Sequence, residues 1–411
     1  MSAQNEQKHL LVIGAGPIGL DAALAATQLE YRVTVLEQGR VGEHLRHWSH
    51  VRLFTPWSIN LSDRAREALR ATGTWTEPEA SACPTGGEMV ENYLEPLAAV
   101  PELRDRIETG VHVVAIARDG LLKGEAILGA GDSRRVDRSF EVLVETAEGE
   151  ERTISADVVI DATGVFSNPN PVGRGGIPAR GERGHAYRLV YGVPDVAGSM
   201  RDRFEGRRTV VVGAGASAAT TVRALNQLKG AEVWWVTRSE GEPIKPIDDD
   251  PLPERAALIA EVNAVGKGEN SVIHLAGSSV TDLSFDGNEW TVSLAQTEGG
   301  AKDIACDEVV VQTGFRPDHS FAEELQFHEC YASQGPMRLA GALLASSSGV
   351  GGGDCMKQES HGAESLLNPE PNYFVIGHKS YGRGSNFLLR IGYEQVSDVF
   401  SLLHSNTEVL P

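Results

Sequence analysis

Two short apolar segments of this chain each run into a glycine-rich turn, LLVIGAGPIG at residues 10–19 and TVVVGAGASA at residues 209–218. An Ala-rich segment follows both, and the order strand, glycines, helix is far more specific than the glycines alone. The first glycine makes a tight turn, the second lets the backbone approach a pyrophosphate, and the third position lets the helix pack on its strand. The pattern therefore predicts two dinucleotide sites. Their expected contact residues are Gly14, Gly16, Pro17 and Gly19 in the first and Gly213, Gly215, Ser217 and Ala218 in the second.

The strand after each helix indicates which nucleotide binds there. RVTVLEQ places Glu37 about 20 residues beyond the first glycine, where a carboxylate accepts the ribose hydroxyls and repels a 2′-phosphate. EVWWVTRS instead ends in Thr237, Arg238 and Ser239, a cationic and hydroxylic cluster that suits a 2′-phosphate. We expect a dinucleotide without that phosphate in the first site and NADPH in the second.

An internal repeat extends beyond the glycines. Residues 140–164, FEVLVETAEGEERTISADVVIDATG, are echoed by residues 290–314, WTVSLAQTEGGAKDIACDEVVVQTG. Each copy alternates like antiparallel strands and then enters an apolar strand that is typical of a buried parallel sheet. The closing glycines, Gly164 and Gly314, leave room for a cofactor or a crossover. The sequence therefore predicts an α/β fold with two Rossmann-like domains, each carrying an antiparallel β-meander.

This arrangement resembles the two-dinucleotide-binding-domain flavoproteins, the superfamily of the flavin-containing monooxygenases and the pyridine nucleotide-disulfide oxidoreductases. The resemblance covers nearly the whole chain and implies FAD in the first site and NADPH in the second. The Gly/Pro-rich stretch 167–187 and the segment GFRPD at 314–318 resemble the two crossovers between the domains. An FAD-binding domain of residues 1–168 and 315–411, with an NADPH-binding domain of residues 169–314 inserted in it, is expected.

The segment GEHLRHWSHVRLFTPWSIN at 42–60 resembles the family's GGxW-type stretch, which reaches toward the flavin. Its histidines, arginines and tryptophans suit stacking on a flat ring and hydrogen bonding to a reduced flavin, or packing against the C-terminal helix. The expected contacts are Gly42, Arg46 and Trp48 on the cofactor and Arg52 and Trp57 on a substrate. A surface salt bridge is an equal alternative for Arg52.

The C-terminal stretch NYFVIGHKSYGRGSNFLLRIGYEQV predicts a buried strand at 373–376, a basic loop, and a helix capped near Ser385 or Asn386. In the disulfide-reductase branch an aspartate usually follows the equivalent of Gly377, whereas His378 follows here. This departure favours the monooxygenase-like branch. Gly377 and Asn386 are expected on the cofactor, and His378 and Tyr381 in the substrate pocket.

The monooxygenase branch is often marked by FxGxxxHxxx followed by an aromatic residue. The nearest match contains Ala179, Gly181, His185 and Leu189, so only the glycine and the histidine are kept. His185 is a candidate site residue, and a coincidental histidine in a loop is the alternative.

Composition excludes several classes of function. The formal net charge of −20 disfavours a nucleic-acid or anionic-membrane partner. The first apolar run is broken by glycines and carries Asp21, unlike a signal peptide.

His44, His47 and His50 share a helical face, but no carboxylate or cysteine pattern completes a metal site, so no metal is expected. Four cysteines without CxxC spacing fit a reducing compartment, so a cytoplasmic location is expected.

The resemblance implies a flavin monooxygenase that inserts oxygen into a small molecule through a C4a-peroxyflavin, with O₂ as the second substrate. An NADPH-dependent flavin reductase acting on a quinone, a disulfide or a partner protein is the alternative, and a nonenzymatic sensor is a third reading. Cys330 and Cys355 flank a Gly/Ser-rich tract and form either a redox pair or two structural thiols. The segment 331–371 is either a lid or a neutral surface loop. No catalytic side chain, substrate or oligomeric state follows from the sequence.

Overall fold

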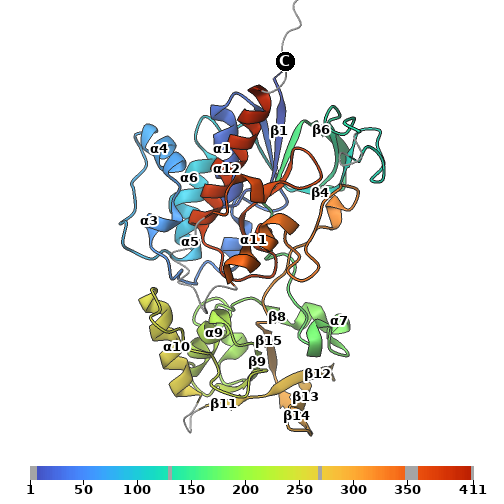
Figure 1. Ribbon diagram of the computed structural model, residues 1–411. Helices are drawn as coiled ribbons and strands as arrows, with labels where there is room; N and C mark the ends of the chain where they lie inside the picture. The colour runs from blue at the N-terminus through green and yellow to red at the C-terminus, as the bar shows by residue number, and fades with distance from the viewer. Residues whose placement is uncertain (1–6, 128–131, 267–270, 348–359, 409–411) are drawn as a thin grey trace, which may run out of the picture. The chain divides into compact units, whose positions relative to one another are not determined.

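The computed structural model describes residues 7–127, 132–266, 271–347 and 360–408. The chain divides into two compact units, Met1–Asn168 with Arg316–Pro411, and Pro169–Phe315 (Figure 1). The second unit ends at Phe315, one residue later than the boundary at residue 314 that the sequence predicts. The first unit is therefore discontinuous, because the second unit is inserted in it.

A parallel sheet organises the first unit, with strand order β16-β7-β1-β2-β3. The strands are β1 (His9–Ile13), β2 (Arg32–Glu37), β3 (Ile107–Thr109), β7 (Val158–Asp161) and β16 (Tyr373–Val375). Every residue of β1 is buried, as expected for a central parallel strand that is covered on both faces. The sheet brings the last strand of the unit beside β7, far from it in sequence.

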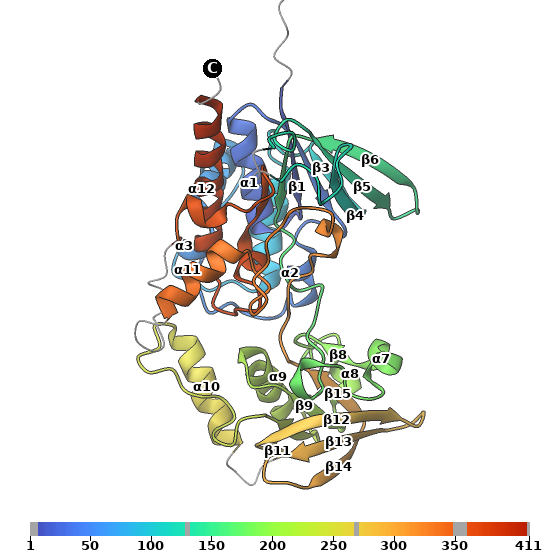
Figure 2. The ribbon, with the colours of Figure 1, turned by 45° about the vertical axis from the view of Figure 1, so that its right-hand side comes forward.

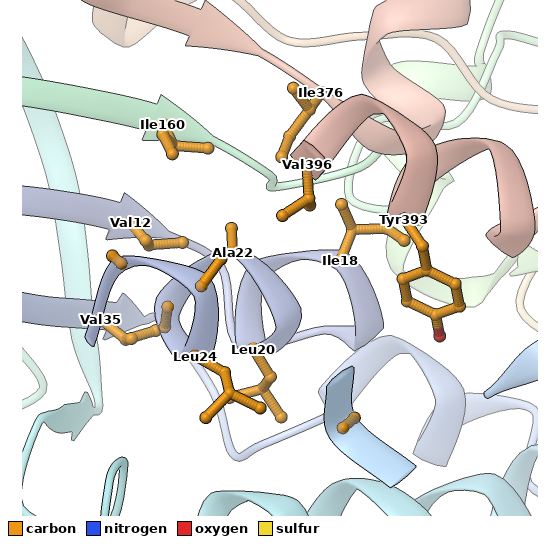
Figure 3. Close-up of a cluster of buried hydrophobic side chains, with 14 of the residues drawn as sticks. Val12, Ile18, Leu20, Ala22, Leu24, Val35, Ile160, Ile376, Tyr393 and Val396 are labelled. Carbon is orange, nitrogen blue, oxygen red and sulfur yellow. The ribbon is translucent and has the colours of Figure 1, made fainter. Parts of the chain in front are cut away.

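Helices cover one face of this sheet. Helix α1 (Pro17–Gln28) runs from β1 to β2 and packs against α12 (Leu389–Glu408). Figure 3 shows the core between them: Val12, Val35 and Ile160 of the strands face Ala22 of α1 and Val396 of α12. The other helical segments are α2 (Glu43–His47), α3 (Trp57–Asn60), α4 (Asp63–Ala71), α5 (Gly86–Met89), the π-helix η1 (Val90–Leu94), α6 (Glu95–Ala98), η5 (Ser320–Ala322), α11 (Met337–Ser347), η7 (Ala363–Leu366) and η8 (Gly377–Tyr381).

An antiparallel meander covers the other face of the sheet. It consists of β4 (Val111–Arg118), β5 (Phe140–Thr146) and β6 (Glu151–Ala156), in that order. Because side chains alternate along a strand, Leu10 and Val12 belong to the helical core and Leu11 and Ile13 belong to the core under the meander. The meander therefore seals the second face of β1.

The second unit repeats this plan (Figure 2). Its parallel sheet has the order β11-β10-β9-β15-β8, and its meander has the order β12-β13-β14. The expectation of two Rossmann-like domains, each with a meander, is confirmed. The elements are η3 (Arg174–Gly176), α7 (Glu182–His185), η4 (Ala186–Arg188), β8 (Val190–Tyr191), α8 (Arg201–Phe204), β9 (Arg208–Val212), α9 (Ala216–Asn226), β10 (Glu232–Val236), α10 (Pro253–Val265), β11 (Val272–Leu275), β12 (Ser278–Phe285), β13 (Trp290–Gln296), β14 (Ala301–Cys306) and β15 (Glu308–Val311).

None of the helices within the described ranges combines the length and the hydropathy that crossing a bilayer requires.

A buried ionic triad joins the meander of the first unit to its C-terminal part. Glu370 accepts from Arg118 Nε at 2.7 Å and from Arg135 Nη1 at 2.9 Å, and all three side chains are fully buried. The backbone N–H of Gln326 also donates to Glu370, at 2.7 Å. Because each charge has partners, the triad is tolerated, but removal of the carboxylate charge leaves two buried guanidinium groups uncompensated.

We predict that Glu370→Gln lowers the free energy of unfolding by about 3–5 kcal/mol, since it keeps the shape of the side chain and deletes its charge. Urea unfolding at pH 7, followed by far-UV circular dichroism, measures the change. Glu364→Gln is the matched control, because Glu364 is exposed and lies 3.5 Å from Arg338. The control should change stability by less than about 0.5 kcal/mol. Equal effects of the two substitutions would contradict the prediction.

Candidate functional site

A cavity of about 580 Å³ lies in the first unit, and the residues that follow β1, β2 and β7 line it. Open α/β sheets bind ligands in this place, beyond the carboxyl ends of their strands. The volume falls within the range of small-molecule and cofactor sites. The cavity is therefore the candidate functional site of this unit.

The first glycine fingerprint forms the middle of the cavity wall. Gly14 has φ +103°, and a Cβ there would lie 2.8 Å from the carbonyl oxygen of Ala162. A Cβ on Gly19 would lie 1.9 Å from the carbonyl oxygen of Gly14, so helix and turn pack in backbone contact. A Cβ on Gly16, by contrast, would meet no atom within 4 Å. Gly14 and Gly19 are required by packing, whereas Gly16 keeps open space at the N-terminus of α1.

That open space is suited to an anion. Gly16 is the N-cap of α1, and no side chain caps the helix there. The first N–H groups of a helix have no partner within the helix, and its dipole favours negative charge at this end. The turn therefore has the geometry of a pyrophosphate site.

Glu37 ends β2 and marks one arm of the cavity. Its carboxylate accepts from the N–H groups of Ala15 at 2.8 Å and Gly39 at 2.9 Å. Burial raises the pKa of this carboxyl, and the two backbone donors act in the opposite direction. The side chain is thus held in one orientation on the cavity wall, where it can accept from ribose hydroxyls.

Aromatic rings line another part of the cavity wall. Phe166 lies 6.0 Å from His44, 6.2 Å from Trp48 and 5.7 Å from His378, measured between ring centroids. His378 stacks on Phe387 at 5.5 Å with the ring planes 10° apart. We call these five cavity-lining side chains the ring wall. It joins α2 and its C-cap, the loop after β7, and the C-terminal segment.

A buried ion pair supports the wall at the end of β7. Lys379 Nζ lies 2.6 Å from Asp161 Oδ2, and both side chains are fully buried. Lys379 also donates to Thr163 Oγ1 at 3.1 Å, and Tyr373 donates its hydroxyl to Asp161 at 3.1 Å. Because Thr163 lines the cavity, this pair positions the turn that faces Gly14.

Many of the residues predicted from the sequence come together here. Those on the cavity wall are Gly14, Gly16, Pro17, Glu37, Gly42, Trp48, Gly164, Gly377 and His378. Arg46 does not line the cavity: it donates to the carbonyl of Val41 and pairs with Glu95 at 2.7 Å. Asn386 is exposed, and the helix that it was expected to cap begins only at Leu389.

The three other predicted pocket residues lie outside the cavity wall. Arg52 donates to the carbonyl of Cys83 and lies 3.6 Å from Glu88. Trp57 is only 4% exposed and packs in the helical core. Tyr381 is buried too, behind Phe387, with ring centroids 5.4 Å apart. The segment after α2 turns back to pair with the chain at Thr85. Arg52 is therefore exposed in a surface salt bridge with Glu88, the alternative given for it, whereas Trp57 is buried in the core.

Sequence reasoning missed His44, Phe166 and Phe387 of the ring wall. Phe166 follows two residues after Gly164, and Phe387 follows Asn386, so both adjoin predicted cofactor residues. Aromatic side chains beside such glycines were the available signal. His44 belonged to the histidines of residues 42–60 that were expected to suit contact with a flat ring, but it was not singled out as a site residue. Within the described ranges, no three potential metal ligands gather.

The second glycine fingerprint has the same geometry in the second unit. A Cβ on Gly213 would lie 2.2 Å from the carbonyl oxygen of Gln312, whereas one on Gly215 would meet no atom within 4 Å. Ala218 is fully buried and Ser217 is exposed. Gly314, at the end of the repeat, has φ +84°. The turn after β9 is therefore as open to a phosphate as the first one.

The strand end after β10 carries the polar cluster that was predicted. Arg238 and Ser239 are exposed, and Arg238 has no ion-pair partner among the described residues. Thr237 is buried, and its hydroxyl lies 2.8 Å from His274 Nε2. In register with the neighbouring strand, Thr237 stands where the first unit has Glu37, and the cation Arg238 directly follows it.

The predicted Gly181 and His185 pair has a packing role. A Cβ on Gly181 would lie 1.9 Å from the carbonyl oxygen of Leu283. The His185 ring contacts Trp290, with centroids 5.6 Å apart, and Phe285 at 6.4 Å. Both residues therefore fasten α7 to the meander of the second unit.

The described cysteines, Cys83, Cys306 and Cys330, carry free thiols. None of them lines the cavity wall as far as the chain is described. Burial raises the pKa of the Cys306 thiol to about 12, whereas hydrogen bonds from Ser333 lower that of Cys330. Cys355 and much of the Gly/Ser-rich tract lie outside the described residues, so the choice between a redox pair and two structural thiols for Cys330 and Cys355 lies outside them as well.

Comparison with protein families gives two matches. A family model described as "Pyridine nucleotide-disulphide oxidoreductase" matches residues 11–122, and a second model with the same description matches residues 76–332. No curated protein sequence matches the chain.

Solved structures share this fold at low sequence identity. The bacillithiol disulfide reductase of Bacillus cereus has a TM-score of 0.67 and 18% identity, over 98% of this chain and 100% of that one. The ornithine N-hydroxylase of Kutzneria sp. 744, with reduced FAD, NADP⁺ and L-ornithine, has a TM-score of 0.65 and 15% identity, over 98% and 100%. The thioredoxin reductase of Lactococcus lactis has a TM-score of 0.61 and 14% identity, over 97% and 100%. At these identities the likeness shows the fold alone.

Burial also predicts how stability depends on pH. It lowers the pKa of several histidines, namely His9, His44, His274, His319 and His378. The unfolded chain then binds more protons than the folded one below the ordinary histidine pKa of about 6.5, so stability rises with pH in this window and is lost as pH falls.

We expect the thermal unfolding midpoint to decrease as the pH is lowered from about 7.5 to about 5.5. Differential scanning fluorimetry at constant ionic strength measures it, and His378→Phe should weaken the dependence. A midpoint that is flat or that rises on acidification contradicts the assignment.

Proposed function

Since the chain belongs to the pyridine nucleotide-disulphide oxidoreductase family of flavin-dependent enzymes, we propose that it is an FAD- and NADPH-dependent monooxygenase that acts on a small molecule. FAD occupies the cavity of the first unit in this proposal, and NADPH binds the second unit. The overall reaction converts NADPH, H⁺, O₂ and a substrate R–H into NADP⁺, R–OH and water.

The residues of the first unit fit FAD. Gly16 leaves open space at the N-terminus of α1 for the pyrophosphate, and Glu37 presents a fixed acceptor to the adenosine ribose. With the adenosine in the Glu37 arm, the flavin half extends toward the ring wall. When bound, FAD supplies the redox chemistry, taking a hydride from NADPH and passing two electrons to the acceptor. The protein contributes binding, orientation and exclusion of water.

The second unit fits NADPH for the corresponding reasons. Gly215 leaves the turn open to a pyrophosphate, and no protein atom lies within 4 Å of a Cβ built there. The exposed guanidinium of Arg238 and the hydroxyl of Ser239 are donors for a 2′-phosphate. Strand β10 ends at Val236, so no carboxylate stands at its end to repel that phosphate.

The observation that carries the choice of acceptor is the composition of the cavity wall. A flavoenzyme that reduces disulfides through its own thiols needs a cysteine beside the flavin. No cysteine lines the cavity among the residues that the structure describes. Apolar and aromatic side chains, including Leu45 and Leu53, line the cavity instead and limit the access of water. Such a wall suits a reaction with O₂ and a small substrate.

We predict that Gly16→Ala abolishes FAD retention without unfolding the protein. The added methyl group meets no protein atom and occupies space that we assign to the pyrophosphate, so only ligand binding suffers. Gly19→Ala is the contrasting variant, because its Cβ would lie 1.9 Å from a carbonyl oxygen and must disturb the turn itself. The ratio of absorbance at 450 to 280 nm (about the flavin and protein maxima) measures FAD, and circular dichroism measures folding. If the Gly16→Ala protein is folded and retains all of its FAD, the proposal that FAD binds in this cavity is wrong.

The proposed function is tested by the fate of oxygen. We expect NADPH to reduce the FAD-loaded protein anaerobically, and turnover under ¹⁸O₂ with a panel of small molecules to give a product that carries one ¹⁸O atom. Mass spectrometry of the product measures this.

Reduction of cystine, a dinitrophenyl disulfide or menadione by NADPH under nitrogen, faster than any oxygenation, would instead make the protein a reductase. Cys330→Ser and Cys355→Ser are the matched controls. Both should keep NADPH oxidation unchanged if no enzyme thiol takes part, whereas loss of turnover in either variant would identify thiol chemistry.

A further inference from the structure

The ring wall carries information about the substrate. His44, Trp48, Phe166, His378 and Phe387 present a nearly continuous aromatic surface to the cavity. Aromatic pairs favour stacked or edge-to-face arrangements, and a planar aromatic guest can extend this series of contacts. The surface therefore selects for flat, apolar molecules.

The charged groups of the cavity are already paired. Glu43 is held by Arg40 at 2.9 Å, and Asp318 accepts from the N–H of Ser320 at 2.9 Å. Glu37 is held by two backbone donors. Among the described lining residues there is neither lysine nor arginine. An anionic substrate would therefore find no lysine or arginine on the described wall to pair with its buried charge, which is unfavourable.

Burial favours the neutral form of the histidines in the ring wall. Burial lowers the pKa of His44 and of His378 below the ordinary histidine value. The ring wall therefore offers no cationic side chain that is favoured to bind a carboxylate of the substrate.

One ring nitrogen of the wall is available to a ligand. His378 Nε2 lies 3.1 Å from the carbonyl oxygen of Gly384, which can only accept, so Nε2 carries the proton. In the neutral ring, Nδ1 then has a lone pair. It has no donor among the described residues, since the Gly384 contact is the hydrogen bond that this ring makes there. A ligand N–H or O–H can donate to it.

We propose that the substrate is a neutral, planar aromatic molecule with an N–H or O–H donor, which lies on the ring wall and donates to His378 Nδ1. The inference rests on the proposed function and names its substrate class. His378 is then a residue that determines specificity. A free amino acid is disfavoured, because its carboxylate finds no lysine or arginine among the described lining residues.

A matched set of naphthalenes tests the inference on the FAD-loaded protein without NADPH. Perturbation of the flavin spectrum gives the dissociation constants of 2-naphthol, 2-methoxynaphthalene, which has no donor, and 2-naphthoate, which is charged. We expect 2-naphthol to bind tightest and 2-naphthoate at least about 100-fold more weakly, because its carboxylate finds no partner. L-ornithine should leave the spectrum unchanged.

Variants isolate the hydrogen bond to His378. His378→Phe keeps a ring to stack on Phe387 and should weaken 2-naphthol about five- to tenfold while leaving 2-methoxynaphthalene unchanged. His378→Gln keeps an acceptor and should recover part of the difference. His50→Phe, at an exposed position away from the cavity, is the control and should change neither constant.

Three results would overturn the inference: equal weakening of both neutral naphthalenes by His378→Phe, a loss of FAD affinity as its main effect, or tighter binding of 2-naphthoate or ornithine than of 2-naphthol. A protein that binds the naphthalenes as expected but never incorporates ¹⁸O refutes only the monooxygenase proposal. One that oxygenates a charged amino acid refutes only this inference.

Discussion

The site depends on a contact between backbones. Gly14 approaches the carbonyl of Ala162, and Gly19 approaches the carbonyl of Gly14, at distances that leave no room for a side chain. These contacts fix the end of β1, the turn after β7 and the start of α1 relative to one another, so the open space at Gly16 has a defined shape. The buried pair of Lys379 and Asp161 holds the same turn from the other side. The cavity is thus defined mainly by main-chain geometry, and the side chains of its arms adapt it to particular ligands.

The main-chain part of this arrangement could be predicted from the sequence. Glycines required by steric contact leave an unambiguous pattern, because any other residue at Gly14 or Gly213 would collide with the neighbouring strand. Apolar strands buried on both faces also stand out, and the repeat of meander and Thr-Gly strand predicted both sheets. Glu37 was found because its place follows from strand length and helix length alone. Such features depend on local rules, which a single sequence contains.

The side-chain part was harder to predict, because it depends on pairing between distant segments. Arg52 and Trp57 have suitable chemistry for a pocket, but the chain pairs at Thr85, so Arg52 lies at the surface beside Glu88 and Trp57 lies in the core. Tyr381 lies behind Phe387 rather than in front of it. Helix α12 begins at Leu389, after a stretch whose Ser385 and Asn386 resemble caps, because tertiary packing outweighs capping preference here. Phe166 and Lys379 acquire their roles only when β7 and β16 lie side by side.

The discontinuity of the first unit has a consequence for how the protein is made. Strand β16 pairs with β7 and helix α12 packs on α1, yet both follow the whole second unit in the chain. During synthesis, the second unit is complete while the first sheet still has an open edge beside β7 and an uncovered apolar face on α1. Partly synthesised chains with such surfaces are prone to aggregate and are typical clients of chaperones. The last parts of the cavity wall to be made are Gly377, His378 and the segment from Phe387 to Leu389, so the cavity is complete only after the whole second unit has been synthesised.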